Sequence, residues 1–277
     1  MSYPLKSYLA TWRPFFSWKS ILVPLICQEM THWLGRNPIR RIVCQVLRNR
    51  TFCITLRQHK DIQIQGRYKE YADFHAIVEV FIDKVYDLTS INCSPSCIID
   101  VGAHIGTFSL LAAKTFPSAH VVAFEPDPDN FILLQTNIRR NCIKVDSHNY
   151  ALADFEGKTY LAGPTSMGRH IGATTGHESQ VRKLTHSVDL NKISRLLLKI
   201  DVEGAEWMIL ADCCNNLPKS TILFVETHGG QTDLERLRAL AARYGFQYDH
   251  SRSKGEYHEN VLRRGEFVVV DLAGGIL

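Results

Sequence analysis

The sequence lacks long hydrophobic runs and paired cysteine motifs. The longest apolar run near its N-terminus, residues 21–27, contains Pro24, is too short to cross a bilayer and is not followed by the small-residue cleavage site of a signal peptide. The eight cysteines include no Cys-x-x-Cys pair, which argues against a zinc site or a thioredoxin-like motif and favours reduced thiols. We therefore expect a cytoplasmic protein.

The sequence also lacks a strong charge of either sign. Lys and Arg number 32 against 28 Asp and Glu, and the resulting formal charge of +4 is too small to indicate a nucleic-acid partner. The hydrophobic fraction of 45% and the charged fraction of 22% are ordinary for a globular protein. A chain of 277 residues is long enough for one large domain, or for one domain with an extension.

Residues 1–50 differ in composition from residues 51–277, and we predict an N-terminal helical extension followed by a single larger domain. The extension is rich in aromatic residues and then in arginines: Trp12, Phe15, Phe16, Trp18, Trp33, Arg36, Arg40, Arg41, Arg48 and Arg50. This pattern suits packing of the aromatic side chains on the main domain, which we favour. It also suits contact with a membrane surface or an acidic partner.

From residue 51 onward, strand and helix patterns alternate. A hairpin is predicted at 51–65, and further strands are predicted at 97–102, 120–125, 145–153, 196–201, 221–226 and 267–272. Helices are predicted at 72–87, 106–116, 127–141, 204–214 and 233–245, the third with Asp127 as its N-cap and Pro128 at its first position. Residues 163–180 lack periodicity and are predicted to form a long loop. The alternation predicts an α/β fold with a mostly parallel sheet and helices on both faces.

Two acidic positions and a glycine pair suggest a nucleotide-type ligand. Asp100 ends a predicted strand, and Gly102 and Gly106 frame the turn into the next helix. Glycines there let the backbone approach a ligand, although a pair of them also suits a plain tight turn. Glu125 ends the next strand, nineteen residues after Gly106, where nucleotide-binding folds place an acid for the ribose hydroxyls. The spacing D-x-G-x-x-x-G differs from the dinucleotide fingerprint G-x-G-x-x-G.

Two later strand ends also carry polar residues. Asn149 to Ala151 lead into Asp154 and suit one wall of an adenine pocket, or a plain strand end. The stretch LKIDVEGAE places Asp201, Glu203 and Glu206 after an apolar run. Carboxylates in the first turn of a helix offset its dipole, which would explain Glu206, and also Glu203, without chemistry. If the strand continues, Asp201 and Glu203 point to the same side of it.

These segments together resemble the FkbM-type methyltransferases over roughly residues 70–277, with LKIDVEGAE as the most specific block. The resemblance implies a Rossmann-like class I methyltransferase fold, S-adenosylmethionine as cofactor, and O-methylation of a sugar or another small metabolite with a hydroxyl acceptor. It assigns Asp100, Gly102 and Gly106 to the methionine side of the cofactor, Glu125 to its ribose, and Asp201 to the catalytic mouth. His104 stands where the family commonly has Asn. The predicted cofactor-binding residues are Asp100, Gly102, Ala103, His104, Gly106, Glu125, Pro126, Asn149, Ala151 and Asp201.

Asp201, Glu203 and His228 are the predicted catalytic residues. Methyl transfer to a hydroxyl requires an oriented acceptor and removal of its proton. His228 follows the strand predicted at 221–226, where it suits the role of base, of a substrate contact or of a structural residue. With Glu226 and Asp201 it also forms an oxygen-rich set suited to magnesium or manganese, a reading that we do not favour. His170 and His177 lie in the predicted loop.

Other functions fit the sequence less well. A nucleic-acid methyltransferase that acts on an exocyclic amine should carry Asn or Asp followed by Pro-Pro and an aromatic residue, and a cytosine C5 enzyme should carry a Pro-Cys nucleophile. Neither motif occurs in the sequence. We therefore expect no nucleic-acid partner. An NAD-dependent oxidoreductase should have the tighter glycine spacing. A non-catalytic binding module with the same fold is the alternative outside enzymes.

Overall fold

The computed structural model describes residues 49–59, 62–163, 170–227, 230–254 and 257–264, together with Phe15 and Val46. Most of the predicted extension at 1–50, the predicted catalytic His228 and the strand predicted at 267–272 lie outside the described residues. The division between the extension and the larger domain at residue 50 therefore stays a prediction.

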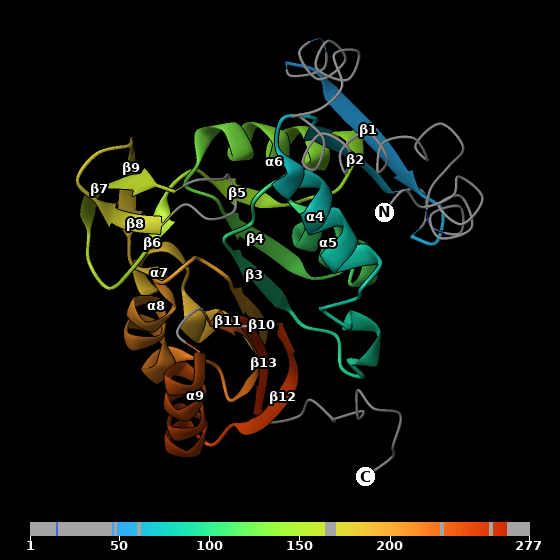
Figure 1. The fold of residues 1–277 in the computed structure, drawn as a ribbon. Coiled ribbons are helices and arrows are strands. Elements are labelled where there is room, and N and C mark those ends of the chain that lie inside the picture. The colour runs from blue at the N-terminus through green and yellow to red at the C-terminus, as the bar shows by residue number, and fades with distance from the viewer. Residues whose placement is uncertain are drawn as a thin grey trace.

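A mostly parallel sheet runs through the centre of the molecule (Figure 1). In the described part of the chain its strand order is β12-β13-β11-β10-β3-β4-β5. The bounds are β3 Cys97–Val101, β4 His120–Phe124, β5 Asp146–His148, β10 Arg195–Ile200, β11 Ser220–Thr227, β12 Gln247–Lys254 and β13 Tyr257–Arg264. The first five are mutually parallel, and β13 pairs antiparallel with both β11 and β12. This arrangement confirms the predicted Rossmann-like α/β class.

Helices cover both faces of this sheet, as predicted. Their bounds are α4 Tyr71–Phe81, α5 Thr107–Thr115, α6 Pro128–Arg140, α7 Leu184–Ser187, α8 Glu206–Cys213 and α9 Gly230–Tyr244, with short 3-10 turns at 88–90, 190–192 and 214–216. Side chains of α4, α5 and α6 belong to one hydrophobic cluster, and those of α7, α8 and α9 belong to a second. The parallel strands β3, β4, β10 and β11 contribute to both clusters, because successive side chains of a strand point to opposite faces. Within the described part of the chain, no helix has the length and apolar character needed to cross a bilayer.

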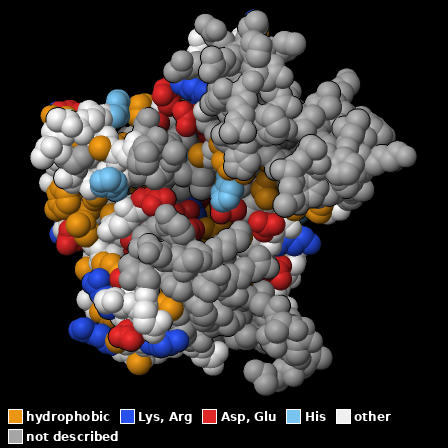
Figure 2. All heavy atoms as spheres, in the orientation of Figure 1, with side chains coloured by type: hydrophobic (Ala, Val, Ile, Leu, Met, Phe, Trp, Pro, Cys, Tyr) orange, Lys and Arg blue, Asp and Glu red, His pale blue; other side chains and the backbone are white. Residues whose placement is uncertain are grey.

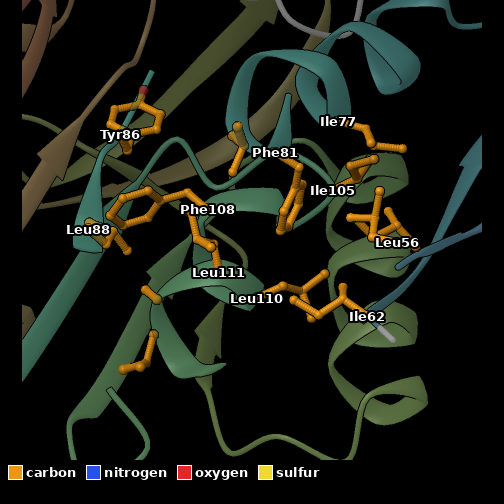
Figure 3. Close-up of a cluster of buried hydrophobic side chains, with 14 of the residues drawn as sticks. Leu56, Ile62, Ile77, Phe81, Tyr86, Leu88, Ile105, Phe108, Leu110 and Leu111 are labelled. Carbon is orange, nitrogen blue, oxygen red and sulfur yellow. The ribbon is translucent and has the colours of Figure 1, made fainter. Parts of the chain in front are cut away.

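The predicted hairpin is present as strands β1 (Thr51–Leu56) and β2 (Ile62–Arg67), which pair antiparallel. It alternates buried and more exposed residues, and its inward side chains join the first cluster together with those of α4 and α5. Figure 3 shows Leu56 and Ile62 of the hairpin in this cluster with Ile77, Phe81 and Phe108. The hairpin is therefore built into the core of the domain.

The segment of the chain between β5 and β10 forms a second, smaller sheet, here called the inserted sheet (Figure 1). Its described strands, in the order β6-β9-β7-β8, are β6 Ala151–Leu152, β7 Gly157–Ala162, β8 His170–Ala173 and β9 His177–Arg182. The prediction of one continuous strand over 145–153 was wrong, because β5 joins the main sheet whereas β6 pairs with β9 of the inserted sheet.

The prediction of a loop over residues 163–180 was wrong for 170–173 and 177–180. These residues form strands because antiparallel pairing with β7 supplies their backbone hydrogen bonds, although their sequence has little hydrophobic periodicity. His170 and His177 therefore begin strands of the inserted sheet.

Candidate active site

The carboxyl ends of β3, β4 and β10 meet at one edge of the sheet. Asp100 on β3 lies level with Ala123 on β4 and with Lys199 on β10. Ligands of open α/β sheets bind beyond this edge. The register therefore brings three predicted site segments together: the Gly102 turn, Glu125 and Asp201.

The turn after β3 depends on two glycines. Gly102 has φ +80°, and a Cβ atom built on it would lie 1.8 Å from the backbone oxygen of Asp201. Only glycine lets the turn pass this close to the end of β10. Gly106 has φ +91° and precedes α5, and a Cβ there would lie 2.6 Å from the Leu134 side chain of α6. Gly102 therefore shapes the site, whereas Gly106 allows two helices to pack.

Glu125 follows β4 and is buried, with both carboxylate oxygens held by protein donors. Oε2 accepts a hydrogen bond from the backbone N–H of His104 (2.7 Å), and Oε1 accepts one from the backbone N–H of Asp127 (2.9 Å). The Asn130 side-chain amide also donates to Oε1 (3.4 Å). Burial raises the pKa of Glu125 to about 7, against the opposing effect of these hydrogen bonds.

Lys199 is buried between two carboxylates. Its Nζ atom lies 3.2 Å from Asp100 Oδ1 and 3.4 Å from Asp201 Oδ2, and it donates a hydrogen bond to the Gly102 carbonyl oxygen (2.7 Å). Burial opposes the charge, yet the two carboxylates hold the pKa of Lys199 above its ordinary value. Ser109 donates a hydrogen bond to Asp100 Oδ2 (2.6 Å). Lys199 therefore ties the ends of β3 and β10 together.

Lys199 was not among the predicted site residues, although its position in the sequence is unusual. Lys199 is the one charge inside the apolar stretch 196–200. A charge inside a buried strand requires a partner of opposite sign, which Asp100 and Asp201 provide.

The three acids after β10 have separate environments. Asp201 keeps 25% of its side chain exposed and lines the cavity together with Glu203. The strand ends at Ile200 and Glu203 has φ +54°, so the condition for a shared strand face of Asp201 and Glu203 is not met. Glu206 is buried in the first turn of α8 and accepts a hydrogen bond from the Gly204 N–H (2.9 Å), as its interpretation as a helix-start acid predicts.

A cavity opens at this edge, between the main sheet and the inserted sheet. Phe124, Tyr150 and Leu152 give it an apolar wall, and Leu161 and Ile171 reach it from the inserted sheet. The acids that line it are Glu125, Asp127, Asp201 and Glu203. Figure 2 shows acidic side chains gathered around a hollow near the middle of the face in view.

The predicted cofactor-binding residues divide into two groups around this cavity. Those that line it are Gly102, His104, Glu125, Pro126, Ala151 and Asp201. Those outside its lining are Asp100, Ala103, Gly106 and Asn149. Asn149 donates hydrogen bonds from Nδ2 to the carbonyl oxygens of Glu125 (2.8 Å) and Pro126 (3.2 Å), so it fixes the chain after β4.

His104 lines the cavity in a left-handed backbone conformation, with φ +50°. Burial lowers the pKa of its imidazole to about 4, with the nearby Asp73 carboxylate acting in the opposite direction. The ring is therefore neutral at pH 7. Its Nε2 atom lies 3.4 Å from Asp73 Oδ1. Among the described residues, no group of three or more His, Cys, Asp or Glu side chains is arranged to hold a metal ion.

Comparison with known proteins agrees with this architecture. A family model described as "Methyltransferase FkbM domain" matches residues 100–248. "Methyltransferase 1" of Beauveria bassiana is 29% identical over 183 residues, which cover 54% of this chain and 73% of that protein. "31-O-demethyl-FK506 methyltransferase FkbM" of Streptomyces tacrolimicus is 27% identical over 228 residues, covering 67% and 88%. "Hexuronic acid methyltransferase AglP" of Haloferax volcanii is 31% identical over 137 residues, covering 47% and 55%.

The match to the family model covers more than half of the chain and includes the Gly102 turn, Glu125 and Asp201. The protein therefore belongs to the FkbM family of methyltransferases.

Proposed function

We propose that the protein is an S-adenosylmethionine-dependent O-methyltransferase that acts on a hydroxyl group of a sugar or another small metabolite. The observation that carries the proposal is one cavity lined by the Gly102 turn, Glu125 and Asp201. Two similar proteins support the acceptor class. One is named as a hexuronic acid methyltransferase, and the other as a methyltransferase of 31-O-demethyl-FK506.

The cavity has the chemical features that this cofactor requires. The apolar wall of Phe124, Tyr150 and Leu152 suits a purine ring, and the Glu125 carboxylate suits the ribose hydroxyls. Gly102 lets the turn after β3 pass close to the end of β10, so that the turn and Asp201 line the same cavity. When bound, S-adenosylmethionine supplies a methyl group on a positively charged sulfur. The acids around the cavity are electrostatically favourable for such a cation.

In the proposed reaction, Asp201 would accept the proton of the acceptor hydroxyl. The hydroxyl oxygen would take the methyl group as the bond from that methyl group to the cofactor sulfur breaks, which leaves S-adenosylhomocysteine. Asp201 suits this role because its carboxylate reaches both the cavity and Lys199, whose fixed charge holds the end of β10 in place. Glu203 lies in the same lining and would orient the acceptor. His228 stays a predicted alternative base, since it lies outside the described residues.

Ligand binding tests the proposal before any acceptor is known. S-adenosylmethionine and S-adenosylhomocysteine should each raise the melting temperature of the purified protein, because a ligand that binds only the folded state stabilises it. NAD serves as the control with the same adenosine group, and it should leave the melting temperature unchanged. Stabilisation by NAD alone would contradict the proposal. Transfer of a labelled methyl group into fractions of a cell extract would then identify the acceptor.

A further inference from the structure

Two charged residues outside the matched family segment lie beside the cofactor cavity. Arg67 ends β2, and Asp73 lies in the first turn of α4, where it is fully buried. Arg67 Nε donates to Asp73 Oδ2 (2.8 Å), and Arg67 Nη2 donates to Asp73 Oδ1 (2.7 Å). The backbone N–H of Arg67 also donates to Oδ2 (2.7 Å). Such a two-pronged pair fixes the orientation of the guanidinium group.

The same guanidinium group reaches towards Glu125 through one intermediate. Arg67 Nη2 donates a second hydrogen bond, to the side-chain oxygen of Asn130 at the start of α6 (2.7 Å). This contact turns the Asn130 amide nitrogen towards Glu125 Oε1, 3.4 Å away. Arg67 therefore determines which end of the Asn130 side chain faces the carboxylate.

Asp73 makes a second connection to the same carboxylate. Its Oδ1 atom lies 3.4 Å from His104 Nε2, and the backbone N–H of His104 donates to Glu125 Oε2. The two carboxylate oxygens of Glu125 are thus held by donors on two different elements, the turn after β3 and the start of α6. Both elements contact the Arg67–Asp73 pair.

We propose that Arg67 and Asp73 are positioning residues that orient Glu125 for the ribose of the cofactor. The N-terminal hairpin and α4 would then complete a binding site whose recognisable motifs all lie later in the chain. This inference rests on the proposed function, because it takes Glu125 as the ribose ligand. If the Arg67–Asp73 pair only stabilised the fold, its loss would not change the part of the binding affinity that comes from the ribose hydroxyls.

The test is calorimetric titration of the full-length protein with S-adenosylhomocysteine. Arg67→Gln should weaken binding by about tenfold or more, the usual effect of losing a hydrogen bond to a charged group. Arg140→Gln is the matched control, because Arg140 also links α6 to β2, through Gln65 (2.8 Å), on the exposed surface. The control should bind within about twofold of the natural protein. The melting temperature of each ligand-free variant reports whether it has folded.

A second variant keeps the proposal testable if Arg67→Gln does not fold. Asn130→Asp retains the oxygen that accepts from Arg67 but replaces the donor to Glu125 with an acceptor. It should also weaken binding by about tenfold or more.

A 2′-deoxy form of S-adenosylhomocysteine separates positioning from structure. Removing the 2′-hydroxyl should weaken binding to the natural protein much more than binding to either variant. In the variants Glu125 is already misoriented, so the hydroxyl contributes less to binding and the two losses are not additive. Equal losses in the natural protein and both variants, or unchanged affinity in both variants, would overturn the proposal. Failure of the natural protein to bind S-adenosylhomocysteine would instead contradict the proposed function.

Discussion

Glu125 is buried and the neighbouring His104 side chain is 12% exposed. The pKa of Glu125 is raised and that of His104 is lowered, and these shifts have opposite effects on how stability changes with pH. Glu125 stays protonated in the folded state up to about pH 7, whereas its ordinary pKa is 4.5. His104 stays neutral in the folded state down to about pH 4, whereas its ordinary pKa is 6.5. Between pH 4.5 and 6.5 the folded state thus binds one proton more than the unfolded state at Glu125 and one fewer at His104.

The two contributions to the pH dependence of unfolding should cancel in this window. Glu125 makes stability fall as pH rises, because the unfolded state binds fewer protons there, and His104 does the reverse. Glu125→Gln should therefore make stability increase more steeply between pH 4.5 and 6.5, and His104→Asn should make it decrease. Each slope should change by at most about 1.4 kcal/mol per pH unit. Urea unfolding over this pH range measures both.

Other charged groups surround this pair and are unchanged in both variants. Lys199 and Asp100 act on Glu125, and Asp73, Arg67, Lys199 and Asp201 act on His104. These surrounding groups are the same in both variants. The difference between the two slopes of unfolding free energy against pH therefore measures the titration of Glu125 and His104. If stability changed with pH in the same way in both variants, the opposite pKa shifts of Glu125 and His104 would be contradicted.

Asp201 gives the sharpest single-residue prediction of the proposed reaction. Asp201→Asn should retain the fold and bind S-adenosylhomocysteine, because Lys199 keeps Asp100 as a partner at 3.2 Å. Methyl transfer should fall by about 10²- to 10⁴-fold, the usual contribution of a general base. Asp189→Asn is the control, an exposed aspartate that is also paired with a lysine, Lys192 (2.9 Å). Full transfer activity in Asp201→Asn would remove Asp201 from the reaction.

At the scale of one element, the turn after β3 is shaped by contact between two strand ends. Gly102→Ala should strongly reduce stability or prevent folding, because the new Cβ atom would overlap the Asp201 carbonyl oxygen. Gly204→Ala is the matched control. Gly204 also has positive φ (+106°), but no atom lies within 4 Å of the position of its Cβ. Both variants place alanine at a positive φ, but only Gly102→Ala also creates the steric overlap. The difference between their melting temperatures therefore measures the overlap, and equal decreases in melting temperature would argue against it.

At the scale of the whole molecule, the hairpin β1–β2 belongs to the same core as the matched family segment. Ile64 is fully buried on the inward face of β2, next to the outward Gln63. Ile64→Ala should lower the free energy of unfolding by about 2–5 kcal/mol in a single cooperative transition. Gln63→Ala should change it by less than about 0.5 kcal/mol. An unchanged urea midpoint in Ile64→Ala would show that the hairpin folds independently of the rest.

The sequence by itself determined most of the helices and parallel strands of the domain and the polar residues at their ends. Apolar runs predicted the parallel strands β3, β4, β10 and β11, because strands covered on both faces need apolar side chains throughout. The glycine motif after β3 was readable because the backbone freedom of glycine is a local property. Glu125 and Asp201 were readable because each follows an apolar run that marks the end of a strand. Local patterns also predicted the hairpin and the Asp127 cap of α6.

Only the tertiary structure decided which of these residues meet. Arg67 and Asn130 are 63 positions apart, and no local pattern predicts that the end of β2 packs beside the start of α6. The strands of the inserted sheet were missed where hydrogen bonding to β7, rather than hydrophobic periodicity, stabilises them. Local periodicity records which side chains are buried, whereas the partner of a buried charge depends on how distant elements pack. The ends of β3, β4 and β10 at the cavity were therefore readable from the chain, whereas the inserted sheet and the hydrogen-bond network around Glu125 were not.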